Sequence, residues 1–394
     1  MALLNVVFGL LEQIESKYIK VHQNRCVLVR NRNAICLRCA QACTSGCITY
    51  ADNKLTISPD KCIGCGTCAT VCPTCALEAR EPDDAELLKE LISATNATDG
   101  QCTIACVDTL KEAEDVYDPT KVVGVACLGR IEESILLSLI KVGAKRIDLV
   151  KGDCTACDYG VGLETAQSVC ESASTLLRTW NNGTEVCICD ELPGSVLLAG
   201  KKEYDESRRA FFSAMKDEIK SPTGQAVAYA TQEKPGDNEV AEPKYVKVMS
   251  DGTLPHFIPN RRERLLDCLS YFGEPQDVLI ETRLWGHVII DTDICNSCHM
   301  CATFCPTGAI TKYFEKDGSL GVDYSPGACV KCRCCVDICR ASALTISEEV
   351  FAVDLLSGAV ERYKMRPVKN PPGKSNSILN AVKSLLNEDQ IYER

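Results

Sequence analysis

Residues 295–305 read CNSCHMCATFC and residues 329–339 read CVKCRCCVDIC, and these two stretches decide the fold of the C-terminal part of the chain. Each has four cysteines at the spacing C-x2-C-x2-C-x3-C. Residues 62–73, CIGCGTCATVCP, repeat this spacing near the other end of the chain. A looser run, CLRCAQACTSGC, occupies residues 36–47 and has three residues between its second and third cysteine. The chain therefore carries two pairs of cysteine runs.

The spacing is typical of iron–sulfur cubanes, in which each iron takes one thiolate. Three close cysteines surround one cluster, and the fourth starts a helix and reaches the neighbouring cluster. The pattern resembles the bacterial two-[4Fe–4S] ferredoxin family over about residues 26–80 and 285–347. The resemblance implies two α+β ferredoxin-like modules with four [4Fe–4S] clusters. The expected C-terminal ligand sets are Cys295, Cys298, Cys301 with Cys339, and Cys329, Cys332, Cys335 with Cys305. The expected N-terminal sets are Cys62, Cys65, Cys68 with Cys47, and Cys36, Cys39, Cys43 with Cys72.

Several residues near these sets have more than one interpretation. Cys334 is an alternative to its neighbour Cys335, and Cys75 is a spare thiol. Cys26 is interpreted as a small buried residue rather than a ligand. His299 lies between two ligands and either tunes a cluster or is a solvated side chain.

The composition separates this chain from other cysteine-rich classes. It has 28 cysteines in 394 residues, and sixteen of them lie in tight runs in which disulfide pairing would be strained. Zinc ribbons use two separated C-x2-C pairs, unlike these runs. Free thiols and oxygen-sensitive clusters favour a reducing cytoplasm, as in an anaerobe. The net charge of −11 argues against nucleic acid as partner, and no apolar run is long enough to predict a membrane span or resembles a signal peptide.

Between the modules, strand-like and helix-like segments alternate over residues 101–189, which predicts a central α/β domain with a parallel sheet. Four cysteines follow the ends of its first three strands: Cys106, Cys127, Cys154 and Cys157. Because the carboxyl ends of parallel strands meet at one edge, where ligands bind, we expect these thiols to form a metal site. The alternatives are a redox-active dithiol and buried structural cysteines.

Residues 122–160 resemble the small iron–sulfur (delta) subunit of methyl-viologen-reducing hydrogenases, through Cys127-x-Gly-Arg130 and through Cys157-Asp-Tyr before a glycine. The resemblance implies one further iron–sulfur cluster and a heterodisulfide reductase-type partner. Asp108 stands where that family has a second cysteine, so the cluster type stays open between [2Fe–2S] and [4Fe–4S], with Cys102 as the reserve ligand. Arg130 is expected either to hydrogen-bond the cluster or to form a salt bridge.

The expected organisation has five parts. These are an N-terminal helix and ferredoxin module (1–80), the α/β domain (81–200), a helix and linker (201–284), the C-terminal ferredoxin module (285–347) and a tail with a docking helix (348–394). Helices are predicted over residues 3–18, 162–179, 203–220, 261–272 and 375–386.

The sequence favours an electron-transfer subunit of an oxidoreductase complex, because clusters placed in series conduct electrons between a catalytic subunit and another donor or acceptor. It contains no triad, phosphate loop or dinucleotide fingerprint that would suggest catalysis by this chain alone. No catalytic residue is assigned. The expected partner is a catalytic subunit such as a hydrogenase, an aldehyde or formate oxidoreductase or a heterodisulfide reductase-type flavoprotein, or a soluble ferredoxin. Two alternatives stay open: an enzyme that binds substrate at the central cluster, and a redox sensor.

Overall fold

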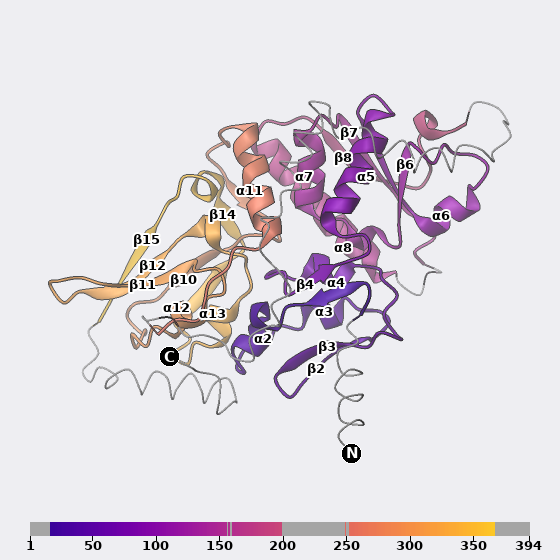
Figure 1. The fold of residues 1–394 in the computed structure, drawn as a ribbon. Helices are drawn as coiled ribbons and strands as arrows, with labels where there is room; N and C mark the ends of the chain where they lie inside the picture. Colours follow the sequence, from indigo (N-terminus) through magenta and orange to yellow (C-terminus); the bar gives the residue numbers. More distant parts are fainter. Residues whose placement is uncertain (1–15, 156, 158–159, 199–248, 250–251, 367–394) are drawn as a thin grey trace, which may run out of the picture.

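The computed structural model describes residues 16–155, 157, 160–198, 249 and 252–366. The helices expected over residues 203–220 and 375–386, and nearly all of the one over 3–18, lie outside these residues. Three regions are visible in Figure 1: an N-terminal module, a parallel-sheet region and a C-terminal module. Within the described ranges, no helix is both long enough and apolar enough to cross a membrane.

The N-terminal module is built from two antiparallel strand pairs and short helices. Strand β1 (Ile19–Val21) pairs with β4 (Leu77–Ala79), and β2 (Ile48–Ala51) pairs with β3 (Lys54–Ile57) in the hairpin that the sequence predicts. The remaining elements are η1 (Gln23–Arg25), α2 (Val27–Arg30), α3 (Arg38–Gln41) and α4 (Thr67–Val71). Helices α3 and α4 carry the two cysteine runs and contact each other.

The C-terminal module repeats this plan. Strand β10 (His287–Ile290) pairs with β13 (Leu344–Ser347), and β11 (Ile310–Phe314) pairs with β12 (Leu320–Tyr324). Its cysteine runs lead into α12 (Met300–Phe304) and α13 (Cys334–Asp337), and η5 (Pro326–Ala328) precedes the second run. A strand that the sequence does not predict, β15 (Glu361–Met365), pairs with β12.

The parallel sheet has the strand order β6-β5-β7-β8, which confirms the predicted parallel sheet. Its strands are β5 (Gln101–Cys106), β6 (Val122–Val125), β7 (Arg146–Val150) and β8 (Glu185–Cys189). Helices α5 (Asp84–Asn96), α7 (Glu133–Lys141) and α8 (Val161–Thr179) share its main apolar core, whereas α6 (Val107–Glu112) and η3 (Gly194–Val196) contribute to a smaller core. The short helix η2 (Leu128–Arg130) follows β6.

The main core also includes residues from beyond the sheet. Helix α11 (Asn260–Phe272) contacts α7, and Lys141 forms an ion pair of 2.6 Å with Asp267. Strand β9 (Leu279–Glu281) pairs with β14 (Glu349–Phe351), which leads into η6 (Ala352–Leu355). The fully buried Trp285 and the buried Leu355 pack in this core. Residues before and after the two C-terminal cysteine runs therefore pack in the core of the sheet region and hold the C-terminal module against it.

Candidate metal centres

Each cysteine run leads into a short helix whose second residue is a cysteine. In the three regular runs the N-cap follows the second cysteine, and the third cysteine is the second helical residue; the N-caps are Gly66, His299 and Arg333, and the cysteines are Cys68, Cys301 and Cys335. In the first run the N-cap, Leu37, follows the first cysteine, and the second cysteine, Cys39, is the second helical residue. In three runs both neighbours of the second cysteine have positive φ: Gly64 and Gly66, Ser297 and His299, Lys331 and Arg333. Alternating left- and right-handed residues turn backbone N–H groups towards one point, a geometry common at iron–sulfur sites.

The C-terminal thiols gather as two groups. Cys295 lies within charge–charge range of Cys298 and Cys339, and Cys301 within range of Cys295 and Cys298. The second group brings Cys335 within such range of Cys332, Cys329 and Cys305. Burial and then repulsion between neighbouring thiolates raise the pKa of Cys335 far above its ordinary value. A bound metal would reverse this by favouring the thiolate.

In the N-terminal module, Cys47 lies beside Cys62. A shared hydrogen bond lowers the pKa of Cys62 to about 5 and raises that of Cys47. The Cys68 thiol is buried near Cys65 and Cys62. The Cys43 sulfur lies 3.4 Å from that of Cys47. The structure thus brings both cysteines from the end of the first run towards the second.

The other N-terminal group forms around Cys72. The thiols of Cys36 and Cys39 both lie within charge–charge range of Cys72, and burial raises the pKa of Cys39 to about 12. The spare thiol Cys75 is buried, and its sulfur accepts a hydrogen bond of 3.1 Å from Arg261 Nε. Arg261 also donates to the carbonyl of Cys72 at 3.2 Å, so one guanidinium fixes the chain on both sides of Pro73.

The central cysteines meet at the carboxyl edge of the sheet. Cys106 ends β5, Cys127 follows β6, and Cys154 and Cys157 follow β7. The charge of Cys154 interacts with those of Cys157 and Cys106, and that of Cys127 with Cys106. Strands β5 and β7 are neighbours although β6 comes between them in sequence, so this edge is a topological switch point, where α/β sheets bind ligands.

Cys127 lies at the junction between the sheet and the N-terminal module. Burial raises the pKa of its thiol to about 11, although the sulfur accepts hydrogen bonds from the Gly129 N–H and the Thr67 hydroxyl. A Cβ built at Gly162 would overlap the Cys127 sulfur, so glycine lets α8 begin directly against this thiol. Because Thr67 lies between Cys65 and Cys68 at the start of α4, the second N-terminal run contacts a thiol of the sheet region.

Buried donors without a protein partner mark where acceptors are missing. Among the described residues they include Arg30 Nε, Arg262 Nη1 and the Thr109 hydroxyl. The charge of Arg30 interacts with Cys305 and Cys332, and that of Arg262 with Cys329. Cluster and cysteinyl sulfurs accept such hydrogen bonds, so the residues present fit iron–sulfur clusters.

The spacing of the thiols also bears on this fit. In the described part of the chain, no three His, Cys, Asp or Glu side chains are arranged to hold one metal ion. A cubane distributes its thiolates over four irons rather than one. Thiols that hold a cubane therefore need not converge on one ion.

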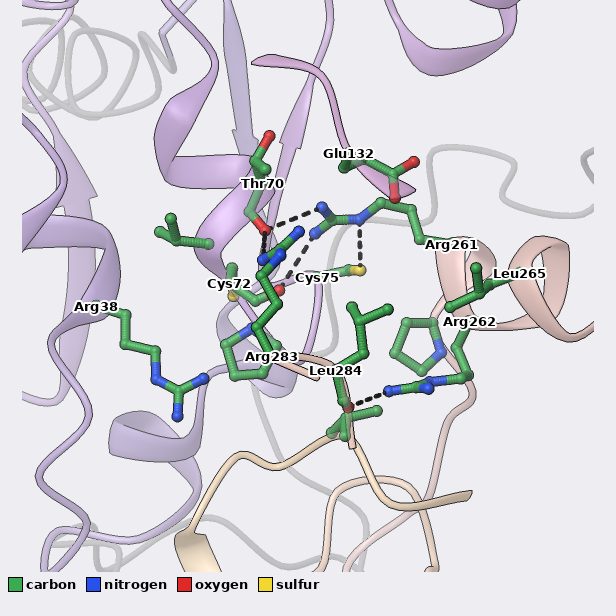
Figure 2. A pocket seen from close by; sticks show the side chains of 14 residues that line it. Arg38, Thr70, Cys72, Cys75, Glu132, Arg261, Arg262, Leu265, Arg283 and Leu284 are labelled. Atoms are coloured by element: carbon green, nitrogen blue, oxygen red, sulfur yellow. Dashed lines mark hydrogen bonds between the residues drawn. The ribbon is translucent and has the colours of Figure 1, made fainter. Parts of the chain in front are cut away.

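Arginines surround the Cys72 region. Figure 2 shows a pocket lined by Cys72 and by the side chains of Arg38, Arg261, Arg262 and Arg283. Arg262 stacks on the Trp285 ring, with 4.0 Å from its guanidinium carbon to the ring centroid. Fixed positive charge near a cluster favours its reduced form, because reduction adds an electron.

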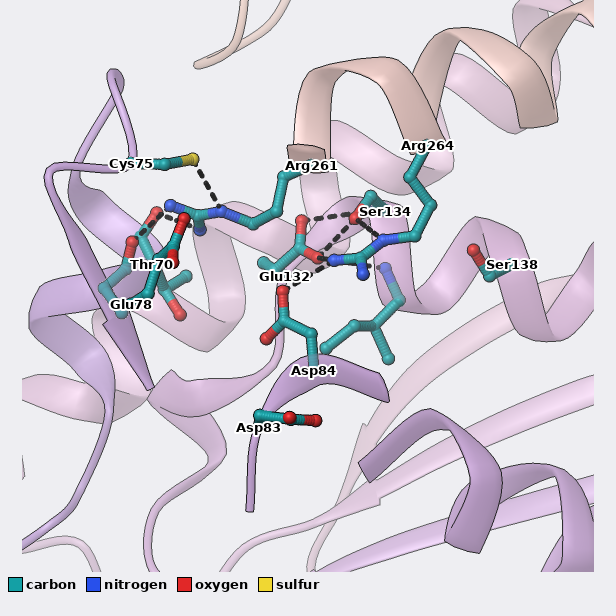
Figure 3. Close-up of polar contacts among 12 residues, drawn as sticks. Thr70, Cys75, Glu78, Asp83, Asp84, Glu132, Ser134, Ser138, Arg261 and Arg264 are labelled. Carbon is teal, nitrogen blue, oxygen red and sulfur yellow. Dashed lines mark hydrogen bonds and ion pairs between the residues drawn. The ribbon is translucent and has the colours of Figure 1, made fainter. Parts of the chain in front are cut away.

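An ion network holds α5, η2 and α11 together, and Figure 3 shows its members Asp84, Arg264 and Glu132. Asp84 pairs with Arg130 at 2.6 Å and with Arg264 at 2.7 Å, and Arg264 also pairs with Glu132 at 3.2 Å. Burial would raise the pKa of Asp84, but the two arginines outweigh it and hold that pKa below its usual range. Of the two roles expected for Arg130, the structure shows the salt bridge.

Sequence reasoning missed Arg30, Arg261 and Arg262 as residues near the thiols. The signal available was their position: Arg30 lies in the apolar stretch between Cys26 and Cys36, and Arg261 and Arg262 open a helix far from any cysteine run. Only tertiary contacts bring these charges to the clusters.

Comparison with known proteins agrees with the cysteine geometry. Residues 55–78 and 288–311 match the model of the 4Fe–4S binding domain. A curated relative, ferredoxin-1 of Caulobacter vibrioides, is 38% identical over 48 residues, which are 12% of this chain and 42% of that ferredoxin. The chain thus aligns with less than half of that relative. These matches indicate that the chain binds [4Fe–4S] clusters in two ferredoxin-type segments.

Proposed function

We propose that this chain is a multi-cluster subunit of an oxidoreductase complex, which relays single electrons between a catalytic subunit and a second redox partner. The proposal includes four [4Fe–4S] clusters in the two modules and a fifth iron–sulfur cluster at Cys106, Cys127, Cys154 and Cys157. When bound, each cluster accepts and releases one electron. The observation that carries the proposal is that the thiol groups adjoin one another in one continuous series.

The first junction of the series joins the two modules. The Arg38 guanidinium donates to the carbonyl of Lys331 at 3.1 Å, and the Ile35 amide donates to Asp337 at 3.1 Å. The charge of Cys334 interacts with that of Cys36. The Cys329–Cys332–Cys335 group therefore lies next to the group around Cys36.

The second junction lies inside the N-terminal module and the third leads into the sheet region. The charge of Cys68 interacts with that of Cys39, which links the two N-terminal groups. The charge of Cys127 interacts with that of Cys65, and the Thr70 hydroxyl donates to the carbonyl of Arg130 at 3.1 Å. A fourth junction joins the two groups of the C-terminal module, where the charge of Cys301 interacts with that of Cys305. Because electron tunnelling weakens steeply with distance, this adjacency favours transfer along the whole series.

The experiment is anaerobic loading of the full chain with iron and sulfide, followed by metal analysis and EPR of the reduced protein. We expect four [4Fe–4S] signals and one distinct signal, with line broadening from magnetic interaction between neighbours. Cys127→Ala should remove the distinct signal and the broadening that it causes. Cys268→Ala is the matched control, since Cys268 is buried in α11 and belongs to no thiol group. Fewer than three clusters, or zinc as the main metal, would contradict the proposal.

A further inference from the structure

The first cysteine run differs from the other three in its alignment with its helix. In the runs that lead into α4, α12 and α13, the first cysteine lies three residues before the second, which directly precedes the N-cap. If the run before α3 is aligned on its N-cap in the same way, Cys36 takes the position of the second cysteine and Cys39 that of the third. The place of the first cysteine then falls on Asn33. This run therefore has no cysteine where the others have their first ligand.

The backbone before α3 differs in the same place. The N-caps of α4, α12 and α13 are left-handed, whereas Leu37 has φ −128°. Instead of a tight loop, a turn closed by a 3.0 Å hydrogen bond from the Ala34 amide to the Asn31 carbonyl precedes the run. This turn follows α2, all four of whose residues are buried. The chain thus enters the site from α2 rather than from a loop of three residues.

Cys26 is the N-cap of α2 and lies at this site. Its side chain is buried, and its charge interacts with those of Cys72 and Cys36, while that of Cys39 interacts with Cys26. The amides of Val29 and Leu28 donate hydrogen bonds to its sulfur. Cysteinyl sulfurs of iron–sulfur sites accept such backbone hydrogen bonds.

We propose that Cys26 is the missing first ligand, so that Cys26, Cys36, Cys39 and Cys72 bind one [4Fe–4S] cluster. The inference rests on the proposed function in that this module binds clusters. Three residues separate Cys43 from Cys39, as three separate Cys72 from Cys68. Cys43 therefore takes the place of the fourth cysteine of its run, the one that reaches the other cluster.

The position of the Cys43 sulfur agrees with this assignment. It lies 3.4 Å from that of Cys47, and the charge of Cys68 interacts with that of Cys43. Cys47 in turn shares its hydrogen bond with Cys62. Both Cys43 and Cys47 therefore lie with the Cys62 group. Residues 44–47 extend beyond the run, because Cys43 already supplies its fourth cysteine.

The test compares Cys26→Ala with Cys268→Ala in the full chain, loaded anaerobically with iron and sulfide. Both variants remove one buried sulfur, so they share the cost of a small cavity. We expect Cys26→Ala to lose either one cluster, about four irons per chain, or one iron with a new [3Fe–4S] EPR signal. Cys268→Ala should keep the wild-type iron content and spectrum.

A second variant keeps the test decisive if Cys26→Ala folds poorly. Cys26→Ser preserves the side-chain shape and offers an oxygen ligand, so it should keep the other clusters and change the spectrum or potential of one. The assignment would be overturned if both Cys26→Ser and Cys26→Ala had the same iron content, sulfide content and spectrum as Cys268→Ala. A wild-type chain without iron would overturn the proposed function as well. Wild type with its clusters but without magnetic interaction between them would overturn only the relay.

Discussion

Arg30→Met is expected to lower the reduction potential of the cluster that we propose at Cys305, Cys329, Cys332 and Cys335. Arg30 is 2% exposed and lies between the two modules. Its guanidinium donates to the carbonyl of Cys305 at 3.5 Å, and its charge interacts with Cys332 and Cys334. A buried positive charge at this place stabilises the added electron, so its removal disfavours reduction.

The size of the effect follows from Coulomb's law. With a separation of about 7 Å between the guanidinium and the cluster and an effective dielectric constant of about 20, the interaction is about 2.4 kcal/mol. For a one-electron couple this corresponds to a shift of about 100 mV towards negative potential. Methionine retains the unbranched stem, so the packing of α2 should change little.

The assay is an EPR-monitored redox titration of the loaded full chain, with Arg32→Met as the control. Arg32 is exposed and two residues away, so water and salt screen its charge, and its removal should shift the potential by about 15 mV or less. An Arg30→Met shift no larger than that of Arg32→Met, or a shift to positive potential, would refute the electrostatic role given to Arg30.

Three other changes test the remaining parts of the site. Asp84→Asn should lower the free energy of unfolding by about 3 kcal/mol, because it leaves Arg130 and Arg264 without their shared carboxylate. The folded pKa of Asp84 is depressed, so wild type should lose this contribution in denaturant melts as the pH falls below about 4, a slope that the variant should lack. Gly66→Ala should reduce the iron content, because φ is +75° and the new Cβ would meet the Arg130 side chain; Gly183→Ala, in open space, should not. Cys127→Ser should change only the distinct EPR signal of the proposed central cluster, and a change in one of the four module signals instead would contradict its assignment.

The sequence predicted the parts of the fold that depend on local pattern. Alternating apolar strands and helices gave the parallel sheet, and cysteine spacing located the turns that lead into α4, α12 and α13. Strand β15 was not predictable, because its partner β12 precedes it by about 40 residues and its residues, ERYKM, show only weak alternation. The place of α11 in the central core was also missed, since its charged sequence resembles that of a solvated helix.

The candidate sites show the same division. Spacing alone identified the three regular runs, because three cysteines within seven residues have few ways to converge. It predicts Cys26 only as a small buried residue, and Cys26 is buried; its proposed role as a ligand has no signal in the spacing, because its distance from Cys36 matches no motif and its position depends on the burial of α2. The charges near the thiols depend on packing between modules, which no local pattern encodes.

The two ends of the proposed series differ from its middle in one respect. Cys298 is the exposed thiol at one end, and Cys154 and Cys157 are half-buried at the other. The groups between them combine buried thiols, such as Cys329 and Cys68, with half-buried ones, such as Cys36 and Cys62. Electrons are exchanged with a partner only where a cluster lies near the surface, and a buried cluster exchanges them with its neighbours alone. The two ends belong to different modules, so each offers a separate place for a redox partner. A diffusible carrier needs only one such place, so this arrangement favours a fixed conduit between two partners.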